Sequence, residues 1–402
     1  MELECKKGIQ LKKMTKPVYL DNQATTPVDP RVLKSMLPFY KQKFGNASSI
    51  HHIYGQECKK VVEQSRGVLA KGLRGDKRNL IFTSGATESI NLGIKGVMEK
   101  FEGAHHIITQ ETEHLAVLDS LKSIEKKGHE ITILPVDSEG LVDPNLISES
   151  IRENTVLVSI MHANNEIGTI QRIDQIGEIC HKRKVLFLVD ACQSFGRLDI
   201  DVKKMKIDLL AASAHKIHGP QGIGLLYVNR KNPMMQLKMQ INGGGHESGY
   251  RSGTLPVPLI VGFSKAFEIC QSSRNEELEK LKVLRDRLYS GIKKKHTDVI
   301  LNGSFRRRLT NNLNLCFPGI DAESIISKLK TIACSTASAC SGMHLKPSHV
   351  IRALGRNSEQ AFSSIRFSLG RFNTKREIDF SIAEINKTID NLKNQKYERK
   401  KK

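Results

Sequence analysis

The sequence contains no tryptophan, and aromatic residues make up only 5% of its 402 residues. It also has no run of about eighteen apolar residues, which excludes a membrane-spanning helix. The first twenty residues mix Glu2 and Glu4 with lysines and lack an apolar stretch, so we expect no secretory signal peptide. They are neither acid-free nor rich in arginine and serine, so nothing supports an organelle transit peptide.

Cysteine is limited to eight residues, and no two of them form a CxxC pair. In a chain of this length, such usage indicates a reducing compartment. We therefore expect a cytoplasmic protein, with a mitochondrion or a mitochondrion-derived organelle as the alternative. Histidines occur at 51–52, 105–106, 215 and 218, but no cysteine or carboxylate joins them at the spacing of metal ligands, so we expect no metal site.

Acidic residues are too few to balance the basic ones: 42 aspartates and glutamates face 63 lysines and arginines, a net charge of +21. This excess is compatible with a nucleic-acid partner, an anionic ligand or a solvated basic surface, and composition does not decide between them. We expect a frayed, solvated tail at the C-terminus, where six of the last ten residues are basic: Lys393, Lys396, Arg399, Lys400, Lys401 and Lys402.

Short β-rich runs alternate with helix-length intervals between about residues 79 and 228. The candidate strands are residues 79–83, 105–109, 130–134, 155–161, 185–190, 208–213 and 223–228. Several are apolar at successive positions, as expected of strands that are covered on both faces of a parallel sheet. The intervals read as right-handed helical crossovers. The pattern predicts an α/β doubly wound domain.

The pattern changes after about Gly262. Two helical stripes of leucine and isoleucine flank the candidate strands 313–317 and 364–368; they are Leu278, Leu281, Leu284, Leu288 and Ile292, and then Ile378, Ile382, Ile385, Ile389 and Leu392. We expect these stripes to pack on their own sheet in a smaller α+β domain, rather than against a partner. The predicted division is an N-terminal segment 1–25 that joins the small domain, a large domain 26–265 and a small domain 266–402.

Polar residues follow most of the predicted strands, at the sheet edge where α/β proteins bind their ligands. Thr83-Ser84-Gly85-Ala86-Thr87 leads into a helix whose N-terminal N–H groups would face an anion, although serine and threonine are also ordinary helix caps. The residues that follow the later strands are His114, Asn164, Asn165, Asp190, Gln193 and Lys216. A carboxylate at the end of so apolar a strand as 185–190 calls for a cationic partner.

One cofactor requires this combination of groups. Pyridoxal phosphate needs a lysine for its Schiff base, a carboxylate that keeps its pyridine nitrogen protonated, a phosphate site and usually a planar group stacked on its ring. Asp190 and Lys216 are 26 residues apart, which suits neighbouring strand ends. Each residue alone would more often be structural, but the whole set predicts a pyridoxal-phosphate enzyme.

The sequence resembles the cysteine desulfurases of the iron–sulfur cluster type, pyridoxal-phosphate enzymes of the class V aminotransferase-like family. The resemblance runs from residue 19 almost to the final helix and rests on ordered motifs at 19–27, 84–89, 112–114, 164–168, 189–193, 215–216, 243–247, 251–254, 338–340 and 364–367. It implies a fold-type I pyridoxal-phosphate transferase. Such a fold has a seven-stranded, mostly parallel sheet in the large domain and a smaller α+β domain that carries a catalytic cysteine loop.

The resemblance also implies how the cofactor is held. Lys216 would bind it covalently, Asp190 would pair with the pyridine nitrogen, and Gln193 with the phenolic oxygen. His114 would stack on the ring and relay protons, and Asn165 would contact both cofactor and substrate. The phosphate would be held by Ala86, Thr87, Ser213 and His215, together with Thr254 from the second subunit of a homodimer.

The implied reaction converts L-cysteine to L-alanine and leaves a persulfide on Cys340, the proposed nucleophile. Attack requires its thiolate, and Arg366 with Asn165 would bind the substrate carboxylate, since a guanidinium grips a carboxylate through two parallel hydrogen bonds. The outer sulfur would pass to an acceptor, either an iron–sulfur scaffold protein or a tRNA-thiolation protein.

The chain departs from the family pattern at three places. Ala337 replaces the usual glycine before Ser-Ala-Cys, Ser248 replaces a common arginine, and a basic tail replaces a longer extension that docks the scaffold. Cys334 is a candidate second sulfur carrier, although a packed bystander is the simpler interpretation. The alternative functions are a selenocysteine lyase or aminotransferase-like enzyme of the same fold, and a nucleic-acid-binding or scaffold protein that has lost catalysis.

Overall fold

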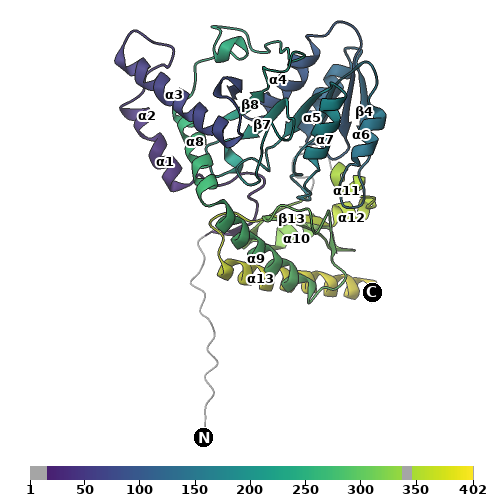
Figure 1. The fold of residues 1–402 in the computed structure, drawn as a ribbon. Coiled ribbons are helices and arrows are strands. Elements are labelled where there is room, and N and C mark those ends of the chain that lie inside the picture. Colours follow the sequence, from purple (N-terminus) through teal and green to yellow (C-terminus); the bar gives the residue numbers. More distant parts are fainter. Residues whose placement is uncertain (1–15, 337–345, 402) are drawn as a thin grey trace.

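The computed structural model describes residues 16–336 and 346–401. Its largest sheet has seven strands in the order β2-β8-β7-β6-β5-β3-β4, in which β8 runs antiparallel to both neighbours and the other pairs are parallel (Figure 1). The strands are β2 (Leu80–Thr83), β3 (His106–Gln110), β4 (Glu130–Leu134), β5 (Thr155–Ser159), β6 (Leu186–Asp190), β7 (Leu209–Ser213) and β8 (Gly224–Val228). The predicted α/β class and the seven-stranded, mostly parallel sheet are confirmed.

Helices cover both faces of this sheet, which explains why its strands are apolar at successive positions. Successive side chains of a strand point to opposite faces. Phe187 and Val189 of β6 therefore pack under one set of helices, while Leu186 and Leu188 pack under another. The first set includes α1 (Pro30–Met36), α3 (Ile53–Gly72), α6 (Pro144–Ser150), α7 (Ile173–Lys182) and α8 (Val257–Ser272), and the second is α4 (Ala86–Met98) and α5 (Leu115–Glu125). The short α2 (Pro38–Lys41) follows α1.

The C-terminal third forms a smaller sheet with the order β12-β13-β10-β9, whose strand pairs are antiparallel. Its elements are α9 (Arg274–Lys293), β9 (Ile300–Leu301), β10 (Asn312–Cys316), α10 (Ala322–Lys328), β12 (Ser335–Thr336), α11 (His349–Ala353), α12 (Ser358–Phe362), β13 (Ser364–Ser368) and α13 (Lys375–Lys401). Figure 1 shows α9 and α13 side by side, and their apolar stripes share one core with β10 and β13. Both predicted stripes thus pack on their own sheet, except for Leu278, which is half-buried and lies outside this core.

The N-terminal segment connects the two sheets. β1 (Val18–Tyr19) pairs in parallel with β11 (Ile332–Ala333), and Leu20 lies in the core of the C-terminal third. The backbone N–H of Thr26 then donates to the carbonyl oxygen of His215, 3.0 Å away, next to the end of β7. This segment therefore runs from the small sheet to the carboxyl edge of the large one.

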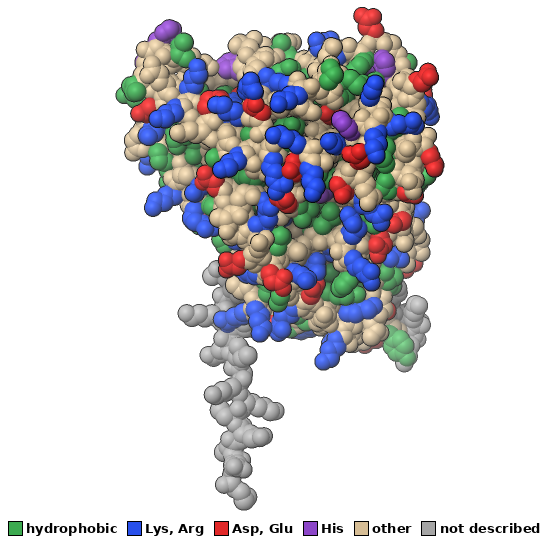
Figure 2. All heavy atoms as spheres, viewed as in Figure 1, with side chains coloured by type: hydrophobic (Ala, Val, Ile, Leu, Met, Phe, Trp, Pro, Cys, Tyr) green, Lys and Arg blue, Asp and Glu red, His purple; other side chains and the backbone are tan. Residues whose placement is uncertain are grey.

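The predicted frayed tail is wrong, because α13 continues to Lys401. Leu392 still packs against the small-sheet core, and Lys393 pairs with Asp298 at 2.9 Å. One turn earlier, Asp390 pairs with Lys295. These contacts join the end of the apolar stripe to the connection after α9. On the face seen in Figure 2, lysine and arginine side chains are spread over the surface rather than gathered in one patch.

Each helix in the described part of the chain is too short or too polar to span a bilayer. Among the same residues, no three histidine, cysteine, aspartate or glutamate side chains come together as a metal-binding group.

The cysteines of residues 16–336 and 346–401 are free thiols. They are Cys58, Cys180, Cys192, Cys270, Cys316 and Cys334. Burial raises the pKa of Cys334 to about 12, as expected of a packed thiol.

Two glycines of α3 provide a matched test of helix packing. A Cβ at Gly67 would meet no atom within 4 Å, whereas a Cβ at Gly72 would lie 2.0 Å from Cε1 of Phe267 in α8. Gly67→Ala should raise the free energy of unfolding by about 0.5–1 kcal/mol, because alanine has the higher helix propensity. Gly72→Ala should lower it by about 1–3 kcal/mol through overpacking. Urea denaturation measures both, and two changes of the same sign would contradict this packing.

Candidate active site

A cavity of about 510 Å³ lies at the carboxyl edge of the large sheet, where β2, β5, β6 and β7 end. Ten of the twelve predicted site residues lie in its wall: Ala86, Thr87, His114, Asn165, Asp190, Gln193, Ser213, His215, Lys216 and Arg366. Thr254 is exposed and is not part of this wall, and Cys340 lies outside the described residues. The parallel strand ends bring most of these groups together, and β13 of the small sheet adds Arg366, 280 residues after Ala86.

Lys216 is held by the N-terminal segment. It ends a 3₁₀ turn, η2 (Ala214–Lys216), that directly follows β7. Its Nζ donates to the carbonyl oxygens of Gln23 and Ala24, at 2.7 and 2.6 Å. Arg197 donates to the carbonyl oxygen of Lys216 at 2.6 Å. Sequence reasoning gave no role to Gln23 and Ala24, although both belong to the motif at 19–27, and their contribution is made by backbone carbonyls that no side-chain pattern reveals.

Asp190 ends β6 and is only 5% exposed. Its Oδ1 accepts a hydrogen bond from the backbone N–H of Cys192 at 2.9 Å. Cys192 also lines the cavity, and burial together with the Asp190 charge raises its pKa well above the usual range. It is therefore a neutral thiol at pH 7, a wall residue that the sequence reasoning did not single out. Gln193 donates from Nε2 to the carbonyl oxygen of Gln23 at 3.0 Å.

His114 is the N-cap of α5, and its Nδ1 accepts from the backbone N–H of Ala116 at 3.1 Å. Burial lowers the pKa of His114. Two neighbouring carboxyl groups are fully buried, and burial raises the pKa of Glu113 to about 8 and that of Glu166 to about 7. Desolvation thus favours the neutral forms of all three side chains. Burial therefore reduces the charge that these groups carry beside the cavity.

The N-terminus of α4 opens into the cavity. Its N-cap, Gly85, has no side chain, and a Cβ built there would meet no atom within 4 Å. The first N–H groups of a helix have no acceptor within the helix, and its dipole favours an anion at this end. His215 lies nearby, and burial together with the Lys216 charge lowers its pKa to about 4, so that its imidazole is neutral. These features suit a bound phosphate.

Arg366 reaches the cavity from β13 of the small sheet. It donates from Nη1 to the carbonyl oxygen of Asn165 at 2.9 Å and from Nη2 to Asp21 at 2.8 Å. Its Nε is buried and has no hydrogen-bond acceptor within the described residues. Asp21 was missed by sequence reasoning, because its partner is 345 residues away. The guanidinium is thus fixed in place in the cavity wall.

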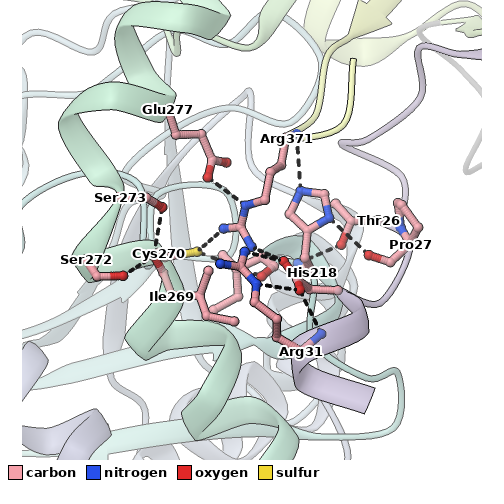
Figure 3. A network of polar contacts seen from close by, with 12 residues as sticks. Thr26, Pro27, Arg31, His218, Ile269, Cys270, Ser272, Ser273, Glu277 and Arg371 are labelled. Atoms are coloured by element: carbon pink, nitrogen blue, oxygen red, sulfur yellow. Dashed lines mark hydrogen bonds and ion pairs between the residues drawn. The ribbon is translucent and has the colours of Figure 1, made fainter. Parts of the chain in front are cut away.

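Figure 3 shows a polar network around Arg371 and His218, and His218 follows Lys216 by two residues in the sequence. Arg371 donates to Asp29 at 2.8 Å and to Glu277 at 2.7 Å, and its backbone N–H approaches Nε2 of His218 at 3.4 Å. The other ring nitrogen of His218 lies 3.0 Å from the carbonyl oxygen of Pro27. A carbonyl only accepts, so Nδ1 carries the proton and Nε2 is the acceptor of a neutral ring. Burial and the Arg371 charge lower the pKa of His218 to about 3.

Comparison with known proteins places this cavity in a family context. The Aminotransferase class-V family model matches residues 18–380. A cysteine desulfurase IscS of Vibrio vulnificus (strain CMCP6) is 47% identical over 383 residues, which cover 94% of each chain. Among solved structures, a NifS-like protein has a TM-score of 0.88 at 37% identity and covers 94% of this chain and 100% of its own. The structure of SspA in complex with cysteine has a TM-score of 0.78 at 36% identity, with 89% and 100% covered.

The neutral His218 predicts a pH dependence of stability. Its pKa is about 3 in the folded chain and about 6.5 when unfolded, so between these values the unfolded chain binds more protons. The free energy of unfolding should therefore decrease as the pH is lowered below about 6.5. The decrease is up to about 1.4 kcal/mol per pH unit for each such proton.

His218→Asn removes this proton and suits the backbone, because asparagine tolerates the positive φ of 64° at this position. Urea denaturation between about pH 6.5 and pH 4.5 should show a shallower slope for the variant than for the unmodified chain. The two slopes would be equal if His218 were protonated in the folded protein.

Proposed function

Because the chain belongs to the aminotransferase class-V family and, within it, to the cysteine desulfurases, we propose that it converts L-cysteine to L-alanine and carries the sulfur as a persulfide. The observation that carries this proposal is the convergence of Lys216, Asp190, His114 and Arg366 on one cavity at the carboxyl edge of the sheet. A relative of similar fold that was solved with cysteine supports the choice of substrate.

The residues of the cavity fit pyridoxal phosphate. Its volume of about 510 Å³ is in the range of cofactor sites, and the open N-terminus of α4 suits the phosphate. Lys216 would hold the cofactor covalently, and Asp190 would keep a proton on the pyridine nitrogen. Gln193 lies in the cavity wall and would pair with the phenolic oxygen, and its buried Oε1 has no hydrogen-bond partner in the described part of the chain. When bound, the cofactor supplies the electron sink that stabilises a carbanion at the substrate Cα.

Arg366 and Asn165 would orient the substrate. The guanidinium already donates to the Asn165 carbonyl and to Asp21, so its plane is fixed before the substrate carboxylate arrives. Lys216 would remove the proton from Cα, and His114 would pack against the ring and relay a proton. Desolvation favours the neutral form of His114. A neutral imidazole would not repel the protonated pyridine ring that pairs with Asp190.

Cys340 would perform the sulfur transfer. Its thiolate attacks the sulfur of the substrate cysteine, a sulfur–sulfur bond forms, and the carbon–sulfur bond of the substrate breaks. The carbon receives the proton that the thiol lost, so that L-cysteine and one thiol yield L-alanine and one persulfide. The outer sulfur would then pass to an iron–sulfur scaffold protein or to a tRNA-thiolation protein.

Thr254 is exposed and does not line the cavity of its own chain, which supports a homodimer in which it reaches the phosphate of the second subunit. We further propose a large cofactor-binding domain at 26–265 and a small domain at 266–402 that carries the Cys340 loop. Residues 1–25 would join the small domain, which the pairing of β1 with β11 supports. The free thiols of the described cysteines and the bacterial relatives favour a reducing compartment such as the cytoplasm.

Lys216→Ala should remove covalent attachment of the cofactor and the base that takes the Cα proton. The purified variant should lose the visible absorbance of the bound cofactor, and alanine formation should fall by about 10²–10⁴-fold. Lys204→Ala, an exposed lysine outside the cavity, is the control and should change neither quantity. A Lys216→Ala variant with normal absorbance and rate would refute the assignment.

Cys340→Ser should keep the visible absorbance of the bound cofactor, because the thiol does not hold it. Alanine release from cysteine and persulfide labelling should fall to background. Cys334→Ser is the matched control, since burial keeps that thiol protonated, and it should retain both activities. Normal alanine release by Cys340→Ser would show that another group is the nucleophile.

A further inference from the structure

A second cavity, of about 1020 Å³, lies at the opposite edge of the large sheet. It is bounded by residues that precede β2, β6 and β7 and by the end of the antiparallel β8, all of which meet at the amino edge of the parallel strands. It shares no wall residue with the catalytic cavity. Any ligand bound here would therefore be separate from the proposed reaction.

Five lysines from four chain segments converge on this cavity. They are Lys77, Lys184, Lys203, Lys206 and Lys231, and His181 lies among them. Within residues 16–336 and 346–401, Lys77 has a carboxylate 3.9 Å away at Glu63, and none of the other four has one within 4.0 Å. Like charges held together without counter-charges repel one another. An anion in the cavity would relieve this repulsion.

The carboxylates in the cavity wall are engaged elsewhere. Asp76 accepts from the guanidinium of Arg78, with the shortest contact at 2.7 Å. Asp208 is buried and accepts from the backbone N–H of Phe187 at 3.1 Å and from the amides of Asn229 and Asn232 at 3.1 and 2.9 Å. The two aspartates thus have other donors and offset the five lysines only in part.

The rest of the wall indicates the class of ligand. Val185, Val202, Tyr227 and Met234 give it an apolar portion beside the lysines. Lysine binds phosphate as a point charge, and several lysines around one concave site suit adjacent phosphate groups. The cavity has the size of a small-molecule site, which a ligand with a flat apolar part can enter. We propose that it binds a nucleotide through adjacent phosphates, with the base against the apolar portion.

The test is calorimetric titration of the cofactor-loaded protein with ATP and with inorganic tripolyphosphate, in Mg²⁺-free buffer at about 0.15 M salt. The charge-reversal variant Lys184→Glu/Lys206→Glu should weaken the binding of both probes at least about tenfold. Lys43→Glu/Lys126→Glu is the matched control, with the same change in net charge on exposed lysines outside the cavity, and should bind both probes as the unmodified chain does.

The proposal would be overturned if the unmodified protein did not bind ATP. It would also be overturned if both charge-reversal variants weakened binding equally, because this would show that a diffuse basic surface attracts ATP. Lys203→Gln/Lys231→Gln is a milder second variant that should weaken binding in the same direction even if the charge reversal impairs folding. Competition with an oligouridylate distinguishes the source of the phosphates. Displacement of ATP by the oligonucleotide would overturn the nucleotide proposal in favour of RNA, because the phosphates of RNA are separated by sugars. Failure of the oligonucleotide to displace ATP supports a free nucleotide as the ligand.

Discussion

The ion pair between Arg371 and Asp29 is the interaction on which the arrangement of the active site depends. The two residues are 342 positions apart, and Asp29 is only 1% exposed. Burying a charge costs several kcal/mol, and ion pairs offset that cost: Asp29 pairs with Arg371 and also with its neighbour Arg31. Only the pair with Arg371 joins segments that are distant in the sequence, so it favours this relative position of the two segments. The chain before Asp29 carries the carbonyls of Gln23 and Ala24 that receive Lys216. The position of Lys216 is therefore linked to charged groups from both ends of the chain.

This ion pair also fixes the state of the groups around it. Because Arg371 lies beside His218, a second positive charge on the imidazole would be repelled, and its hydrogen bond to Pro27 requires only the neutral ring. The same principle holds at the cavity of about 510 Å³, where burial lowers the pKa of the wall residue His114 and raises that of its neighbour Glu113. Desolvation thus keeps these titratable groups largely neutral. The electrostatic field at the site then comes mainly from the few ionised groups that have specific partners.

Much of the fold and of the cavity could be predicted from the sequence, because both follow from local patterns. Strands such as β6 are apolar at successive positions, and the ends of parallel strands meet at one edge, which placed Asp190 and Lys216 together. Asp21, Gln23 and Ala24 could not be predicted in this way, since they act through backbone carbonyls or through partners far along the chain. The contact of the C-terminal helix through Lys393 with Asp298, 95 residues away, was likewise not predictable from a local pattern.

The excess of basic residues has different consequences at the two edges of the large sheet. At the carboxyl edge, Arg366 and Arg371 are nearly inaccessible to water, and each is paired with a carboxylate because an unpaired buried cation would be too costly. At the amino edge, the lysines of the larger cavity remain hydrated, so they can stay without carboxylate partners in the described structure. Buried cations are therefore used within the protein to fix geometry. Hydrated ones keep their charge available, and this is the part of the +21 that can act on another molecule.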